Sequence, residues 1–181
     1  MEGHSRRDLL RIAAGAAAAV PLAAQPTTPL FFTPAEFQMV DELTEIIIPA
    51  DDHSPGARAA NVATYLDKSL AEAFENEPRQ RFREGLKLVD KLSGELNTKT
   101  FLESTPKQRV AVVAQMARNE KKPKKPEELF FVQLKASTAF AYYTSSIGIH
   151  QEMEYKGNTM QNEYAGFDAG LAPIQLPDSS R

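Results

Sequence analysis

Two short runs beyond the first 24 residues hold side chains that could do acid–base or metal chemistry. Residues 51–53 read Asp-Asp-His, and His150 stands close to Glu152 and Glu154. The first run could bind a metal, but adjacent side chains rarely point at one ion, and carboxylates before a turn and a helix also accept from free N–H groups. The second set could act as general acid and base, but no nucleophile or pocket marks it. We therefore expect no catalytic and no metal-binding residue here.

The chain also lacks the patterns of the common cofactor sites. It has no cysteine, which excludes disulfides, thiolate metal sites, iron–sulfur clusters, covalently attached haem and a cysteine nucleophile. No G-x-G-x-x-G turn and no P-loop occurs. The formal net charge is -3, which gives no general attraction to nucleic acid. We expect no cofactor in this chain and no nucleic-acid partner.

Two other features suit contacts rather than catalysis. Residues 121–126 hold four lysines interrupted by prolines, and this loop could touch anionic lipid or an acidic partner. A solvated loop is the favoured interpretation, because no amphipathic membrane helix adjoins it. Adjacent tyrosines such as Tyr142 and Tyr143 usually pack their rings into the core and leave one polar edge in contact with solvent. A role for them in an interface stays open.

The first 24 residues resemble an export signal rather than part of a fold. Arg6 and Arg7 stand before a short, alanine-rich segment, which is the twin-arginine pattern. The segment is too short to cross a bilayer, which needs about 20 apolar residues. We therefore expect a twin-arginine signal peptide over 1–24, a linker over 25–32 and the twin-arginine translocase as a partner during export. Because that pathway moves folded proteins, a signal on a chain without a cofactor motif suggests that the cargo is a partner.

The rest of the chain predicts an all-α domain over 33–145, an irregular bundle of about five helices. Helical spacing of apolar residues and capping boxes predict these helices at 33–48, 57–75, 78–93, 105–117 and 126–144. Phe74 and Val110 are among the residues expected to be buried. Residues 126–144 form the most apolar helix, which we expect to be central. From 146 to 181 we expect an extended C-terminal segment, composed of turns and extended chain, that contacts a partner.

Two blocks of sequence resemble the gluconate 2-dehydrogenase subunit 3 family. The first runs from Thr-Pro-Ala-Glu-Phe at 33–37 to Ile-Ile-Pro-Ala-Asp at 47–51 and continues through Pro-Gly-Ala-Arg at 55–58 to Tyr-Leu-Asp at 65–67. The second runs from residue 131 to Tyr-Tyr-Thr-Ser at 142–145 and includes Tyr-Lys-Gly-Asn at 155–158. The twin-arginine leader also resembles that of the family. The region from 76 to 125 is only generically helical.

This resemblance implies a non-catalytic small, or gamma, subunit of a periplasmic dehydrogenase for sugars or sugar acids. In the family the large subunit carries FAD and oxidises the sugar, and a multihaem cytochrome c subunit often takes the electrons. The small subunit is needed for maturation and supplies the export signal. We then expect a periplasmic chain, peripheral to the inner membrane through the complex. We expect its partner surface to include six residues: Tyr142, Tyr143, Ile147, Gly148, Tyr155 and Gly157.

Two alternatives remain from the residues alone. The chain could be a free-standing periplasmic helical module that binds a small ligand or regulates another protein. It could also be an enzyme whose site is assembled from scattered Asp, Glu and His side chains. Recovery with or without a large flavin-bearing polypeptide separates the first alternative from the subunit hypothesis, and turnover of a sugar by the lone chain would support the second.

Overall fold

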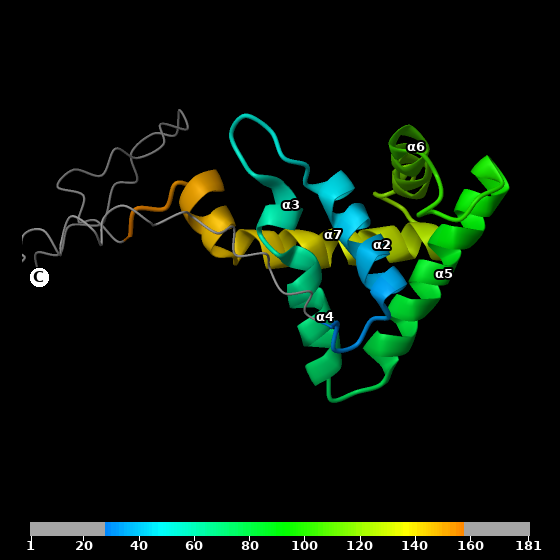
Figure 1. Ribbon diagram of the computed structural model, residues 1–181, viewed down its shortest axis with the longest axis horizontal. Helices are drawn as coiled ribbons and strands as arrows, with labels where there is room; N and C mark the ends of the chain where they lie inside the picture. Colours follow the sequence, from blue (N-terminus) through cyan, green and yellow to red (C-terminus); the bar gives the residue numbers. More distant parts are fainter. Residues whose placement is uncertain (1–27, 158–181) are drawn as a thin grey trace, which may run out of the picture.

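The computed structural model describes residues 28–157, which are entirely helical or irregular. The described residues contain six α-helices and one π-helix, shown in Figure 1: Pro34–Ile47 (α2), Gly56–Ala59 (α3), Val62–Glu72 (α4), Glu77–Asn97 (α5), Pro106–Ala117 (α6), Pro126–Tyr143 (α7) and Gly148–Glu152 (η1). The predicted all-α class is confirmed. The leader with Arg6 and Arg7, and the tail from 158 onward, lie outside the described residues.

Both predicted capping boxes are visible at helix starts. The Thr33 hydroxyl accepts from the N–H of Glu36 at 3.2 Å, and the Glu36 carboxylate accepts from the N–H of Thr33 at 2.8 Å. At α6 the amide oxygen of Gln108 accepts from the N–H of Thr105 at 2.9 Å. These contacts satisfy N–H groups that lack a partner in the first turn of a helix. Helix α2 ends at residue 47, two positions before Pro49, as the proline predicted.

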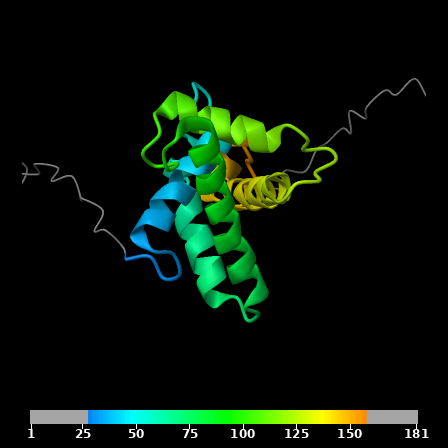
Figure 2. The same cartoon turned by 90° about the vertical axis from the view of Figure 1, so that its right-hand side faces the viewer.

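Helix α7 is the central element, as its apolar sequence predicted. It contacts α2, α4, α5, α6 and η1. In Figures 1 and 2 the other helices lie mainly on one side of it, and α6 lies across it. Its residues Leu134 and Tyr142 are fully buried. Gly85 of α5 packs directly against the Phe130 ring of α7, at a place where a Cβ atom would overlap the ring. The close approach of α5 and α7 therefore depends on a residue without a side chain.

The expected second helix is divided into two pieces. Asn61 adopts a left-handed conformation with φ of 55°, so the chain turns between α3 and α4. Asparagine is among the few non-glycine residues that tolerate this conformation. Helix α4 also ends at Glu72, earlier than expected, and Phe74 lies fully exposed in the connection to α5. Val110, expected to be buried, is 52% exposed, because α6 turns Val112 and Val113 inward.

The chain after α7 is more ordered than expected. Residues 148–152 form a π-helix, although turns and extended chain were predicted from residue 146. The Ser145 side chain fixes this junction: its hydroxyl donates to the Tyr142 carbonyl at 2.6 Å and accepts from the N–H of Gly148 at 3.0 Å. The segment lacks sustained helical periodicity, so its shape comes from these local hydrogen bonds and from packing against α7.

Candidate partner-binding surface

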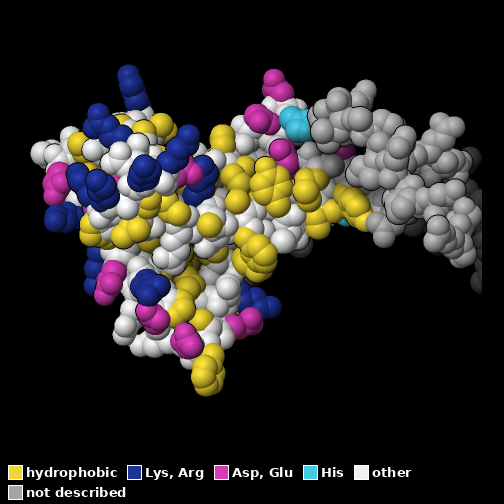
Figure 3. Space-filling model, turned by 180° about the vertical axis from the view of Figure 1, so that it is seen from behind, with side chains coloured by type: hydrophobic (Ala, Val, Ile, Leu, Met, Phe, Trp, Pro, Cys, Tyr) yellow, Lys and Arg dark blue, Asp and Glu magenta, His cyan; other side chains and the backbone are white. Residues whose placement is uncertain are grey.

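The C-terminal half of α7 carries exposed aromatic side chains. Phe140 and Tyr143 are 59% and 42% exposed, and they stand one turn apart on the helix. Tyr65 of α4, 44% exposed, lies beside Phe140 with 6.2 Å between the ring centroids. We call these three residues the aromatic strip. On the face seen in Figure 3, hydrophobic side chains form a band, and most of the Lys and Arg side chains visible on that face lie toward one end.

Further exposed apolar groups follow the end of α7. Met153 and Tyr155 are 50% and 51% exposed. Their segment is held in place because the N–H of Met153 donates to the Gly148 carbonyl at 2.9 Å and that of Tyr155 donates to the Ile149 carbonyl at 3.0 Å. Exposed apolar groups that cluster, rather than scatter, mark interaction surfaces. Aromatic anchors are also the residues most enriched at protein interfaces.

Of the six residues expected at the partner surface, two lie beneath it. Tyr142 is completely buried, and its hydroxyl forms a hydrogen bond with the Ser54 hydroxyl. Burial raises the pKa of the Tyr142 phenol, which favours the neutral form. Gly148 is also buried, and a Cβ atom there would overlap the Tyr142 carbonyl. Tyr142 and Gly148 therefore pack inside the junction of α7 and η1, and in this structure neither residue is open to a binding partner.

The other four residues lie at or near the surface. Tyr143 and Tyr155 are exposed, as given above, and Gly157 is exposed with φ of +88°, a conformation that favours glycine. Ile147 is partly buried and packs against the hydrophobic core. Phe140 and Tyr65 complete the exposed surface, and sequence reasoning did not select them for it. Phe140 had a usable signal, because its position three residues before Tyr143 places both on one helical face.

The run at 51–53 forms a turn. The Asp51 carboxylate accepts from the N–H groups of Ser54 at 2.7 Å and His53 at 2.9 Å. These two bonds lower the pKa of the Asp51 carboxyl, and the bond from the Ser54 N–H has the larger effect. The expected hydrogen-bonding role of this aspartate is therefore confirmed. Within residues 28–157, no group of three or more His, Cys, Asp or Glu side chains is arranged to hold a metal ion.

The second set of candidate acid–base residues is not assembled into a site. His150, Glu152 and Glu154 lie in or just after η1, where His150 and Glu154 are exposed. No hydrogen bond or ion pair connects any two of them. The described structure therefore does not bring these three side chains into contact with one another.

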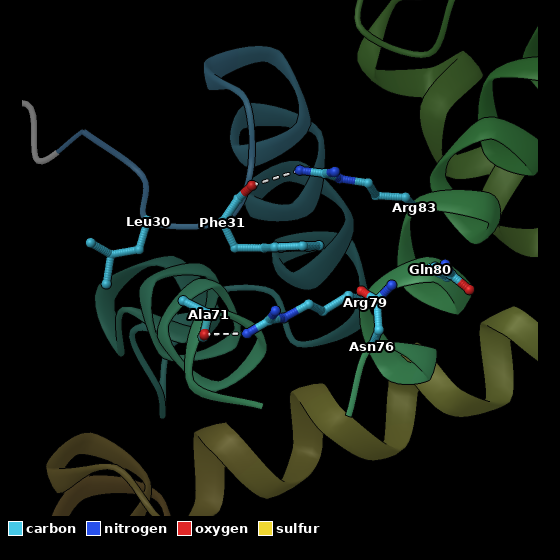
Figure 4. A pocket seen from close by; sticks show the side chains of 7 residues that line it. All are labelled: Leu30, Phe31, Ala71, Asn76, Arg79, Gln80 and Arg83. Atoms are coloured by element: carbon cyan, nitrogen blue, oxygen red, sulfur yellow. Dashed lines mark hydrogen bonds between the residues drawn. The ribbon is translucent and has the colours of Figure 1, made fainter. Parts of the chain in front are cut away.

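An open pocket of about 530 Å³ lies between the segment before α2 and the facing ends of α4 and α5, with Leu30, Phe31, Ala71, Asn76, Arg79, Gln80 and Arg83 around it (Figure 4). The side chains of its two arginines donate hydrogen bonds to backbone carbonyl groups. Arg79 donates to the carbonyls of Leu70 at 2.7 Å and Ala71 at 2.5 Å, at the C-terminal end of α4. Arg83 donates to the Phe31 carbonyl at 2.9 Å and lies 4.4 Å from the centre of its ring. These guanidinium groups therefore fasten the walls of the pocket together.

A buried aspartate anchors the start of the domain. The Asp67 carboxylate, on α4, accepts from three successive backbone N–H groups, those of Leu30 at 2.6 Å, Phe31 at 3.0 Å and Phe32 at 2.8 Å. Phe32 is buried in the core. The end of the segment expected as a linker over 25–32 is thus packed into the domain. The signal for Asp67 was present in the sequence, since it stands beside Leu66 and three residues before Leu70 on the buried stripe.

Comparison with known proteins gives a family for this arrangement. The family model for gluconate 2-dehydrogenase subunit 3 matches residues 34–160, more than half of the chain. The chain belongs to the gluconate 2-dehydrogenase subunit 3 family. The resemblance seen in the sequence is therefore confirmed, and the family name is that of a subunit of a multi-subunit dehydrogenase.

Other comparisons add no relative. No protein with a curated description matches the chain, and no solved structure does. Among residues 28–157, no helix is long and apolar enough to cross a membrane. The family assignment, the aromatic strip and the leader sequence are therefore the observations on which a function can be proposed.

Proposed function

We propose that this chain is the non-catalytic small subunit of a flavin-dependent sugar or sugar-acid dehydrogenase. The observation that carries the proposal is the family match over residues 34–160. In this role the chain supports maturation of an FAD-bearing large subunit and provides its twin-arginine export signal. The complex works in the periplasm, peripheral to the inner membrane. Where a multihaem cytochrome c subunit is present, as it often is in the family, that subunit receives the electrons.

The aromatic strip supports the proposal as a docking surface for the large subunit. Its rings are exposed, and the buried Tyr142 and Gly148 lie next to the adjoining η1 segment. Exposed aromatic groups that become buried on binding can contribute a large share of the binding energy.

The test is recovery of the C-terminally tagged chain from its native cells, followed by absorption spectroscopy and mass analysis. We expect a yellow complex with a flavin spectrum and a second, much larger polypeptide. A colourless chain recovered alone would contradict the proposal and favour a free-standing binding module.

A matched pair of variants tests the docking surface. The double variant Phe140→Ser, Tyr143→Ser should reduce recovery of the large subunit by at least roughly tenfold, since aromatic anchors carry a large share of interface energy. The control, Leu96→Ser with Val110→Ser, removes two equally exposed apolar groups from α5 and α6. If the strip variant still recovers the large subunit, the interface lies elsewhere, while the subunit assignment stands on the first experiment.

A further inference from the structure

The loop between α6 and α7 is a fixed structure. The buried Glu128 carboxylate accepts from the backbone N–H groups of Lys124 at 2.8 Å and Lys125 at 3.1 Å, and from the Asn119 side chain at 2.6 Å. These bonds lower the pKa of the Glu128 carboxyl, and the bond from the Lys124 N–H has the largest effect. The carboxylate is therefore ionised at neutral pH. The basic residues around it are therefore presented from a defined backbone.

The positive charge on this loop is only partly compensated. Arg118, Lys121, Lys122 and Lys124 are exposed, and none forms an ion pair with another described residue. Of the acidic residues nearby, Glu120 pairs with Lys135 at 2.7 Å, and Glu127 lies 4.0 Å from Lys125. We call Arg118, Lys121, Lys122, Lys124 and Lys125 the basic surface. An open groove beside it is lined by Ala117, Arg118, Asn119, Glu120, Lys121 and Lys122, so one carboxylate stands among its cations.

The composition of the basic surface favours a lipid over a protein. Four of its five cations are lysines, and lysine is depleted at protein interfaces, where arginine is enriched. Clusters of four to eight Lys or Arg residues are typical of surfaces that bind anionic phospholipids. Leu129, 53% exposed and one turn from Lys125 on α7, adds an apolar side chain near the cluster. No amphipathic membrane helix adjoins the loop, so the attraction would have to be mainly electrostatic, at about 1 kcal/mol for each Lys or Arg near the membrane surface.

We propose that the basic surface docks this chain onto a bilayer that contains anionic phospholipids, with its lysines facing the headgroup phosphates. The aromatic strip lies on the C-terminal half of α7, whereas the basic surface precedes and begins the same helix. Contact with a membrane at one end therefore leaves the strip open. The proposal concerns this chain alone and holds whether or not a large subunit binds the strip.

The test is co-sedimentation of the full chain with phosphatidylcholine vesicles that contain phosphatidylglycerol, compared with phosphatidylcholine alone. Every sample carries Arg6→Gln, Arg7→Gln and Arg11→Gln, so that charges of the leader do not contribute. We expect binding only to the anionic vesicles, and weakening as salt is added. Lys121→Gln, Lys122→Gln, Lys124→Gln should reduce partitioning roughly a hundredfold, at about a fivefold effect for each lysine.

A matched triple variant separates a local surface from net charge. Lys68→Gln, Lys87→Gln, Lys91→Gln makes the same change in net charge at exposed positions of α4 and α5, and should reduce binding only slightly. Unchanged circular dichroism melting of both triples shows that the fold is intact. Equal losses in the two triples, or absence of binding to anionic vesicles, would overturn the proposal. The proposal would also be overturned if the protein with the loop lysines intact did not bind anionic vesicles while the loop triple variant lost the large subunit. That result would assign the basic surface to a protein partner.

Discussion

At the residue scale, a few buried polar side chains connect one element of this chain to another. Asp67 joins α4 to the segment before α2, and Glu128 joins α7 to the preceding loop. Ser54 and Tyr142 join the loop after α2 to the end of α7. Buried polar groups are costly unless paired. The partners of Asp67 and Tyr142 lie far away in the sequence, whereas those of Glu128 lie three to nine residues before it.

Asp67→Ala should destabilise the protein by about 3 kcal/mol, because three buried or partly buried N–H groups lose a charged acceptor. Urea unfolding followed by circular dichroism measures the change. The matched control is Asp52→Ala, an exposed aspartate of the 51–53 turn, which should change stability by less than about 0.5 kcal/mol. Equal effects of the two substitutions would show that the Asp67 contacts contribute nothing particular.

The Glu128 anchor predicts an acid-dependent loss of stability. Its pKa in the folded protein lies below the ordinary value of 4.5, so its contribution is complete above that value and is lost as pH falls through the lowered pKa. Glu128→Gln cannot titrate, so its melting temperature should fall less than that of the wild type when the pH is lowered through this range. Parallel melting profiles for the two proteins would be inconsistent with this role.

At the element scale, the close spacing of α5 and α7 depends on the position of a glycine, which has no side chain. Helix α5 carries two glycines with different surroundings: Gly85 faces the Phe130 ring of α7, and Gly94 faces open space. Both cost conformational entropy in a helix, but only Gly85 permits a contact in return.

The two glycines predict opposite effects of the same substitution. Gly85→Ala should destabilise the protein by about 2 kcal/mol, since the new methyl group overlaps an aromatic ring in a packed core. Gly94→Ala should stabilise it by up to about 1 kcal/mol, because alanine has the higher helix propensity. Thermal unfolding of both variants is the measurement, and a stabilising Gly85→Ala would mean that α5 and α7 are not as close as described.

At the scale of the whole molecule, the surface is divided between two kinds of contact. The aromatic strip and the basic surface belong to different ends of α7, and the N-terminal segment that follows the leader is tied to α4 by Asp67. We propose that a second folded protein travels with this chain, which would give the proposed export signal for folded proteins its physical purpose.

The leader provides the prediction that belongs to this scale. Arg6→Lys with Arg7→Lys should leave both this chain and the large subunit in the cytoplasm, because the export machinery recognises the arginine pair. Cell fractionation followed by immunoblotting of both polypeptides measures this. Retention of this chain alone, with normal export of the large subunit, would show that the chain is not the carrier.

The sequence by itself determined the helical class, the start of each capped helix and the family. These features depend on local information: apolar spacing along a helix, capping pairs such as Thr33 with Glu36, and short runs such as residues 47–51. The many contacts of α7 were also predictable from its apolar sequence, but Phe140 and Tyr143, which extend the apolar residues around its circumference, are exposed.

Only the tertiary structure decided which of the apolar side chains in each helix are buried and which are exposed to water. Tyr142 and Tyr143 are alike in sequence, yet one is sealed against Ser54 and the other is exposed. Phe74 and Phe140 are exposed, whereas Phe130 fills the space beside Gly85. Burial depends on which elements approach one another, and those approaches are set by contacts between residues far apart in the chain, which local periodicity does not encode.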